Sequence, residues 1–319
     1  MSDRLVLDAS LTSDETPPPT GGGVSGGPET DDEHPDGFVA GADSAQIYWQ
    51  AWLPSGEPRA VVVIAHGIGE HSGRYSHVAA RLTAAGFAAY ALDHRGHGRS
   101  SGRRALIDRM DHAVADVDSF VTLAASRHVG RPLHLLGHSM GGAIALAYAL
   151  RHQERLRGLV LSSAAASLAS APASARLEAR VLGVVTPDAG IMEIDPSLVS
   201  RDQAVVRAYR EDPLVYQGKL PARTVAEIAA TIEGFASQVP ALRLPLLVMA
   251  GTGDRIVPPS GSRMVHDRAG SPDRTLRLYD GLYHELFNEP ERRVVLGDVT
   301  AWLDARTVPH HVEAETVSA

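Results

Sequence analysis

The stretch Leu133-His134-Leu135-Leu136-Gly137-His138-Ser139-Met140-Gly141-Gly142 decides the expected fold. Its first four residues form an apolar run typical of a buried strand, and residues 140–151 read as a helix. A Gly-x-Ser-x-Gly pentapeptide between a strand and a helix is typical of a nucleophile elbow, a sharp turn that presents a serine side chain. The two glycines are needed because neighbouring side chains would collide with so tight a turn. In this context the motif predicts that Ser139 is a nucleophile.

Strand-like and helix-like stretches alternate on both sides of this motif. The expected strands are 46–53, 60–65, 88–92, 133–136, 159–162, 246–250 and 276–279, and the expected helices are 78–85, 112–125, 140–151, 260–266 and 292–305. Such alternation is typical of a mainly parallel sheet with helices on both faces. We therefore predict an α/β fold with a mostly parallel central sheet flanked by helices.

Three segments depart from this alternation. Residues 1–36 are rich in Pro and Gly and hold nine acidic residues against one arginine, so we predict a disordered acidic leader. Residues 163–244 are Ala-rich, and we predict a helical cap there, broken into short pieces by Pro187, Pro196, Pro213 and Pro221. The cap separates the two parts of the core, 37–162 and 245–306. Residues 307–319 are predicted to be a disordered tail.

The composition excludes several classes of protein. Outside the leader, 29 acidic residues balance 29 basic ones, and no basic stripe is present, so nucleic acid is not an expected partner. The absence of cysteine excludes disulfides, thiolate metal sites and cysteine nucleophiles. The first ten residues lack the basic and apolar parts of a signal peptide, and no apolar run approaches eighteen residues. We therefore expect a cytoplasmic protein without a transmembrane helix.

A serine hydroxyl needs a base to remove its proton, and the base needs a third group to orient it. Asp254 follows the expected strand 246–250, at the end of the strand where ligands meet α/β sheets. His284 follows the strand 276–279 after a short turn, so it returns to the same sheet edge. The order Ser, Asp, His is that of the α/β-hydrolase fold. Ser139, Asp254 and His284 are the predicted catalytic triad.

The stretch His66-Gly67-Ile68-Gly69-Glu70-His71-Ser72 follows the strand 60–65, where this fold supplies its second oxyanion donor. We predict that the backbone amides of Ile68 and Met140 form the oxyanion hole. Asp93-His94-Arg95-Gly96-His97-Gly98-Arg99-Ser100 crowds histidines beside an aspartate and could supply metal ligands. We favour instead a hydrogen-bonded turn that braces the loops of the site, and we predict no metal.

Four further residues are candidates for substrate binding. His138, Glu70 and Arg74 could line a polar subsite for an alcohol or glycerol headgroup, or could satisfy one another as a buried network. Tyr209 in the cap could point its phenol at that subsite, although packing is the alternative. An apolar stretch around residue 187 either packs on the sheet or forms a lipid-facing lip. A transient contact with a membrane surface through the cap is therefore left open.

Taken together, three motifs resemble those of the monoacylglycerol lipase branch of the α/β-hydrolases, over about residues 37–306. The motifs are His66 to Tyr75, Asp93 to Gly98 and Gly137 to Gly142. The run from Gly69 to Tyr75 is the most selective, because most hydrolases of this fold carry another sequence there. The resemblance implies a cap over an apolar acyl tunnel, a single acyl chain on glycerol as substrate, and no cofactor. It also assigns a cap motif to Tyr209, Asp212, Pro213 and Leu214.

The predicted function is that of a serine hydrolase that cleaves monoacylglycerols to fatty acid and glycerol through an acyl-enzyme, with a lipid or small ester as its binding partner. A lysophospholipase or a short-chain carboxylesterase would share every catalytic residue and differ only in pocket shape. An acyltransferase would pass the same acyl group to an alcohol, if the cap excluded water. A hydrolase-like binding protein is the non-enzymatic alternative, although it has no need of a complete triad.

Overall fold

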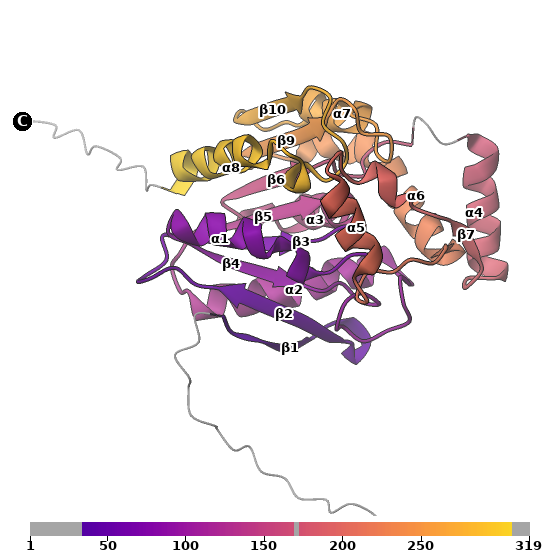
Figure 1. Ribbon diagram of the computed structural model, residues 1–319, viewed down its shortest axis with the longest axis horizontal. Coiled ribbons are helices and arrows are strands. Elements are labelled where there is room, and N and C mark those ends of the chain that lie inside the picture. The colour runs from indigo at the N-terminus through magenta and orange to yellow at the C-terminus, as the bar shows by residue number, and fades with distance from the viewer. Residues whose placement is uncertain (1–33, 169–171, 308–319) are drawn as a thin grey trace, which may run out of the picture. The chain divides into compact units, whose positions relative to one another are not determined.

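An eight-stranded sheet with helices on both faces organises the part of the chain that the structure describes, residues 34–168 and 172–307 of a computed structural model (Figure 1). The strand order is β1-β2-β4-β3-β5-β6-β9-β10. β1 and β2 are antiparallel additions, and all other neighbours are parallel. The strands are β1 (Asp36–Ala40), β2 (Gln46–Trp52), β3 (Ala60–Ala65), β4 (Phe87–Leu92), β5 (Leu133–His138), β6 (Gly158–Ser162), β9 (Leu246–Gly251) and β10 (Arg274–Tyr279). The predicted α/β class is confirmed.

Two apolar cores, one on each face of the sheet, follow from the alternation of side chains along each strand. On β3, Val61 and Val63 belong to one core, and Val62 and Ile64 belong to the other. The first core includes side chains of α2 (Met110–Arg127), α3 (Ser139–His152) and α7 (Ser260–Arg268). The second includes α1 (Ser76–Ala84) and α8 (Arg292–Thr307). The central strands are buried on both faces, which explains why they read as continuous apolar runs.

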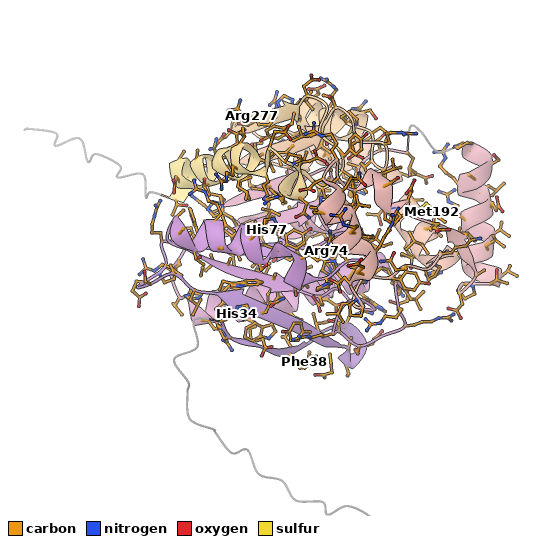
Figure 2. All side chains as sticks on the ribbon, in the orientation of Figure 1. His34, Phe38, Arg74, His77, Met192 and Arg277 are labelled. Atoms are coloured by element: carbon orange, nitrogen blue, oxygen red, sulfur yellow. The ribbon has the colours of Figure 1, made fainter. Side chains whose placement is uncertain are left out.

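Residues 163–245, between β6 and β9, form what we call the insertion. In its described part it contains α4 (Ala173–Val185), β7 (Gly190–Met192), α5 (Gln203–Glu211), β8 (Leu220–Pro221) and α6 (Ala222–Gln238), and β7 pairs with β8 apart from the main sheet. Its prolines lie between or at the ends of these elements, so α6 reaches 17 residues, longer than the short pieces expected. Figure 2 labels Met192 on the insertion, and His34 and Phe38 beside the β1–β2 edge.

Strand β1 begins inside the segment expected to be a leader. Asp36 opens β1, opposite Gln50, and the Pro35 carbonyl accepts a hydrogen bond of 2.8 Å from the Ala51 amide. The boundary expected at residue 36 is therefore too late, because a short edge strand with a glycine gives little pattern until its partner is known. Thr307, expected in the tail, is the last residue of α8. The rest of the predicted leader and tail, 1–33 and 308–319, lies outside the described residues.

Candidate active site

The strand-to-helix turn at Ser139 is tight and strained. Ser139 begins α3 with a positive φ of 53°, a conformation that costs a non-glycine residue of order 1–3 kcal/mol. A Cβ on Gly141 would lie 2.2 Å from the carbonyl oxygen of Ala65, and one on Gly137 would lie 2.5 Å from that of Gly141. Backbone packing on both sides therefore requires glycine at both positions, as the pentapeptide indicated.

Three side chains from three different strand ends form one hydrogen-bonded chain. His284 Nε2 lies 2.9 Å from Ser139 Oγ, and His284 Nδ1 lies 2.7 Å from Asp254 Oδ2. The second carboxylate oxygen of Asp254 accepts from the amides of Ile256 and Val257, at 2.9 Å each. All three side chains are buried. Asp254 fixes the histidine with its proton on Nδ1, so Nε2 is free to accept the proton of the serine hydroxyl.

The electrostatics of this chain favour an imidazolium. Burial by itself would lower the pKa of His284, but the charge and hydrogen bond of Asp254, together with the nearby Glu285 and Glu70, outweigh burial, and the pKa lies above the ordinary 6.5. Burial likewise tends to raise the pKa of Asp254, yet its contact with His284 and its two amide donors hold that pKa below 3.8. The charged state that His284 adopts on taking a proton is therefore stabilised.

The loop after β3 holds one peptide group in a fixed orientation. The His94 amide donates to His66 Nε2 at 2.9 Å, so the proton of this imidazole is on Nδ1, which donates to the Gly67 carbonyl at 2.7 Å. That carbonyl shares its peptide group with the Ile68 amide, and burial lowers the pKa of His66, which keeps the ring neutral. Among the described residues, the backbone amides of Ile68 and Met140 donate no hydrogen bond to a protein acceptor, so both are available to an oxyanion.

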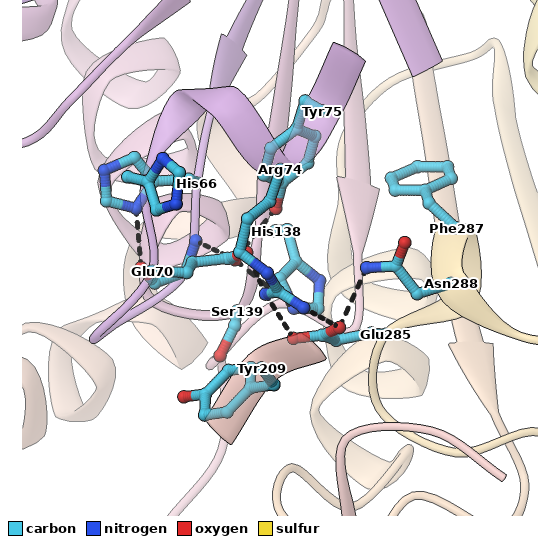
Figure 3. A network of polar contacts seen from close by, with 12 residues as sticks. His66, Glu70, Arg74, Tyr75, His138, Ser139, Tyr209, Glu285, Phe287 and Asn288 are labelled. Carbon is cyan, nitrogen blue, oxygen red and sulfur yellow. Dashed lines mark hydrogen bonds and ion pairs between the residues drawn. The ribbon is translucent and has the colours of Figure 1, made fainter. Parts of the chain in front are cut away.

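A buried ionic network lies beside this loop (Figure 3). Glu70 accepts from the Gly67 amide at 2.6 Å, from Tyr75 Oη at 2.9 Å and from Arg74 Nη1 at 2.6 Å. The Arg74 guanidinium also makes a two-point contact with Glu285, with Nη1 to Oε1 and Nη2 to Oε2 both 2.7 Å. The network therefore joins the loop after β3 to the loop that carries His284.

The four predicted substrate-binding residues are all close to this network. His138 Nε2 lies 4.0 Å from Glu70 Oε1, and its ring centre lies 4.7 Å from that of His284. Tyr209, from α5, stacks on the Arg74 guanidinium at 4.8 Å. Of the two readings of Glu70 and Arg74, the described contacts favour mutual satisfaction, because each is paired within the network. His138, Glu70 and Tyr209 nevertheless line the same cavity as Ser139.

That cavity is small, with a volume of about 20 Å³. This is room for a water molecule but not for an acyl chain. Its lining comes from both the core and the insertion: Gly67, Ile68, Glu70, His138, Ser139, Ile194, Val199, Tyr209, His284 and Glu285.

Sequence reasoning missed Glu285 and Asn288. Glu285 is 5% exposed and accepts a further hydrogen bond of 2.8 Å from Asn288 Nδ2. A signal was present, because a carboxylate directly after His284 must lie at the same sheet edge. A glutamate in a loop is usually solvated, so the sequence alone gave no reason to bury it.

The histidine-rich stretch after β4 forms the bracing turn that was favoured over a metal site. Asp93 accepts from the amides of Ser72 and Arg99, at 2.7 Å each, and so links the loop after β3 to its own loop. Within the described ranges, the group with the spacing of metal ligands is a different one, Asp43, Asp108 and His112.

Comparisons with known proteins point in one direction. The family model described as serine aminopeptidase, S33, matches residues 56–291. The chain is similar to a monoacylglycerol lipase of Mycolicibacterium smegmatis, with 44% identity over 83% of this chain and 95% of that protein. It is 34% identical to the human monoglyceride lipase over 84% of this chain and 90% of that protein.

A solved structure is similar over the same extent. The monoacylglycerol lipase of Paleococcus ferrophilus superposes with a TM-score of 0.75 at 32% identity, covering 82% of this chain and 99% of that one. The likeness thus extends over both the core and the insertion.

Proposed function

The chain belongs to the serine aminopeptidase S33 family and, within the α/β-hydrolases, to the monoacylglycerol lipase-like branch, and we propose from this that it hydrolyses monoacylglycerols to fatty acid and glycerol. The observation that carries the proposal is the hydrogen-bonded chain from Ser139 through His284 to Asp254. The relatives that carry lipase names supply the substrate class.

In the proposed mechanism, His284 Nε2 takes the proton of Ser139 as its Oγ attacks the ester carbonyl carbon. The negative charge of the tetrahedral intermediate is held by the Ile68 and Met140 amides, each worth about 3–4 kcal/mol by analogy with other oxyanion holes. The intermediate collapses when His284 returns the proton to the departing glycerol oxygen. Water then attacks the acyl-enzyme by the same route and releases the fatty acid.

His66 and Asp254 act as positioning residues in this scheme. His66 holds the carbonyl side of the Gly67–Ile68 peptide group, so the Ile68 amide points where the oxyanion forms without reorganisation. Asp254 holds the imidazole and stabilises its charged form.

We further propose that the insertion opens to admit substrate and contacts a lipid surface. The cavity that the described residues form at Ser139 has no room for an acyl chain, which supports movement of its roof. Leu177, Val181, Val184 and Val185 lie on one face of α4 and are each more than half exposed. Such a stripe fits a peripheral contact with a micelle or bilayer. None of the helices in the described ranges has the length and apolar character needed to cross a membrane.

The test is a substrate panel run with the wild-type protein, Ser139→Ala and Ser262→Ala, where Ser262 is a buried serine of α7 outside the site. The panel contains monoacylglycerols, lysophospholipids, triacylglycerols and short p-nitrophenyl esters, with fatty-acid release as the readout. We expect rapid monoacylglycerol turnover that Ser139→Ala abolishes and Ser262→Ala retains. Cleavage of short esters alone would contradict the lipase assignment. If no substrate is cleaved, the alternative of a hydrolase-like binding protein would be favoured.

A further inference from the structure

The buried network beside the triad carries an unbalanced charge. Glu70 and Glu285 contribute two carboxylates, and Arg74 contributes the one guanidinium that pairs with both. Burial raises the pKa of Glu70, but the Arg74 guanidinium, the neighbouring histidines and the Gly67 amide together outweigh burial and bring that pKa to about 2, so Glu70 is ionised. Both side-chain oxygens of Glu285 act as hydrogen-bond acceptors, for the Arg74 guanidinium and the Asn288 amide, as the two oxygens of a carboxylate do.

Three groups that face this network, Tyr75, His138 and Tyr209, do not neutralise the excess. Tyr75 donates its hydroxyl to Glu70, and burial raises the pKa of Tyr75, so it stays uncharged. His138 is uncharged near neutral pH, because burial lowers its pKa to about 4. Tyr209 contributes the face of its ring. The network therefore has a net charge of −1 at neutral pH.

Arg74 has little left to offer a ligand. Two of its nitrogens are engaged with three carboxylate oxygens, and Tyr209 covers one face of the guanidinium. The arginine side chain is 10% exposed. Among the described residues that line the cavity at Ser139, the carboxylates are Glu70 and Glu285, and neither lysine nor arginine is present.

We propose that the Glu70–Arg74–Glu285 network makes this site reject substrates with an anionic headgroup, and that Glu285 supplies the uncompensated charge. The inference rests on the proposed function and narrows its substrate class to acylglycerols with an uncharged headgroup. A glycerol hydroxyl can donate a hydrogen bond to a carboxylate oxygen, whereas a phosphate brings acceptors and negative charge into a water-poor cavity. At separations of about 7 Å and an effective dielectric constant of about 20, one such charge pair changes binding roughly ten- to hundredfold.

The experiment compares two substrates that differ in one group, 1-octanoylglycerol and 1-octanoylglycerol 3-phosphate, both below their aggregation concentrations. We expect the wild type to prefer the uncharged substrate by about a hundredfold or more in kcat/KM. Glu285→Gln keeps the shape and most hydrogen bonds but removes the excess charge. It should narrow the preference by about tenfold or more, chiefly by raising kcat/KM for the phosphate.

A matched control is Asp116→Asn. Asp116 is also fully buried in a two-point pair with an arginine, Arg95, at 2.7 and 2.9 Å, but it does not line the cavity. Removing its charge should leave the substrate preference unchanged.

A second substrate separates charge from size and needs no variant. The dimethyl ester of the same phosphate is larger but uncharged, so the wild type should cleave it far better than the free phosphate. The proposal is overturned if the dimethyl ester is rejected as strongly as the phosphate, if the wild type cleaves the phosphate within a few-fold of octanoylglycerol, or if Glu285→Gln leaves the ratio unchanged. Failure of the proposed function is distinct, because the wild type would then not cleave octanoylglycerol at all.

Discussion

Helices α3 and α4 are similar in length and both rich in alanine, yet they are buried to opposite degrees. In α3, every residue from Ser139 to Ala149 is buried between the sheet and its neighbours. In α4, only Ala179 and Gly183 are buried, and an apolar face is exposed. The proposed nucleophile, Ser139, therefore begins an element that cannot shift without disrupting the core. Helix α4 belongs to the insertion and, unlike α3, has few buried contacts to lose.

The largest expected difference in stability is between two glycine-to-alanine variants, one in each helix. Gly141→Ala in α3 would place a methyl group 2.2 Å from two backbone carbonyl oxygens. We expect the free energy of unfolding to fall by about 3 kcal/mol or more, because buried backbone cannot retreat. Gly183→Ala in α4 meets the Ala226 methyl at 2.9 Å, and α4 can move outward while gaining up to about 1 kcal/mol of helix propensity.

Urea unfolding of both variants measures this difference. A change within about 1 kcal/mol for Gly183→Ala would support a loosely held α4. If Gly183→Ala destabilises the protein as much as Gly141→Ala does, the contrast between the two helices is wrong.

A change in pH is expected to have an intermediate effect on the free energy of unfolding. This effect should come from the α/β core, which contains several buried histidines, and not from the insertion, which contains no histidine. Burial lowers the pKa of His134, on β5, to about 3. Between pH 6.5 and 3 the unfolded chain binds a proton there and the native chain does not, so stability falls as pH decreases. One such group contributes a slope of up to about 1.4 kcal/mol per pH unit.

Replacing this histidine tests that slope. His134→Gln should flatten the dependence of unfolding free energy on pH between 6.5 and 5, measured by urea unfolding. The matched change His266→Gln, in α7 and partly exposed, should not. Equal slopes in all three proteins would refute the assignment of acid sensitivity to buried core histidines.

The smallest effect is expected at the surface of α4. Val184→Ser with Val185→Ser should reduce activity several-fold on monoacylglycerol in micelles or vesicles, because the exposed apolar face is lost. Activity on a monomeric short ester should be unchanged, and stability should change by less than about 0.5 kcal/mol. Val294→Ser is the control, since Val294 is a 61% exposed valine on the surface of α8, outside the insertion. A loss on both kinds of substrate would contradict a surface-contact role.

The elements that the sequence predicted well are those whose pattern is complete in one segment. β3 agrees residue for residue, and β2, β4, β5, β6, β9 and β10 agree within two residues. β3, β4, β5, β6 and β9 are buried along their whole length and therefore read as apolar runs, whereas β10 is only partly buried. The edge strand β1 and the short pair β7–β8 were missed. Each is short, partly exposed and defined by its partner rather than by its own composition.

The sequence by itself determined the candidates for the triad, since Ser139, Asp254 and His284 each occupy a position relative to a strand that local pattern reveals. The tertiary structure alone decided how the polar residues around them pair. Arg74 and Glu285 are 211 residues apart, and nothing in either segment specifies the other. Their contact, and the net charge it leaves beside Ser139, exist because the sheet brings the loops after β3 and β10 to one edge. Local propensity cannot encode a pairing that depends on strand order and burial.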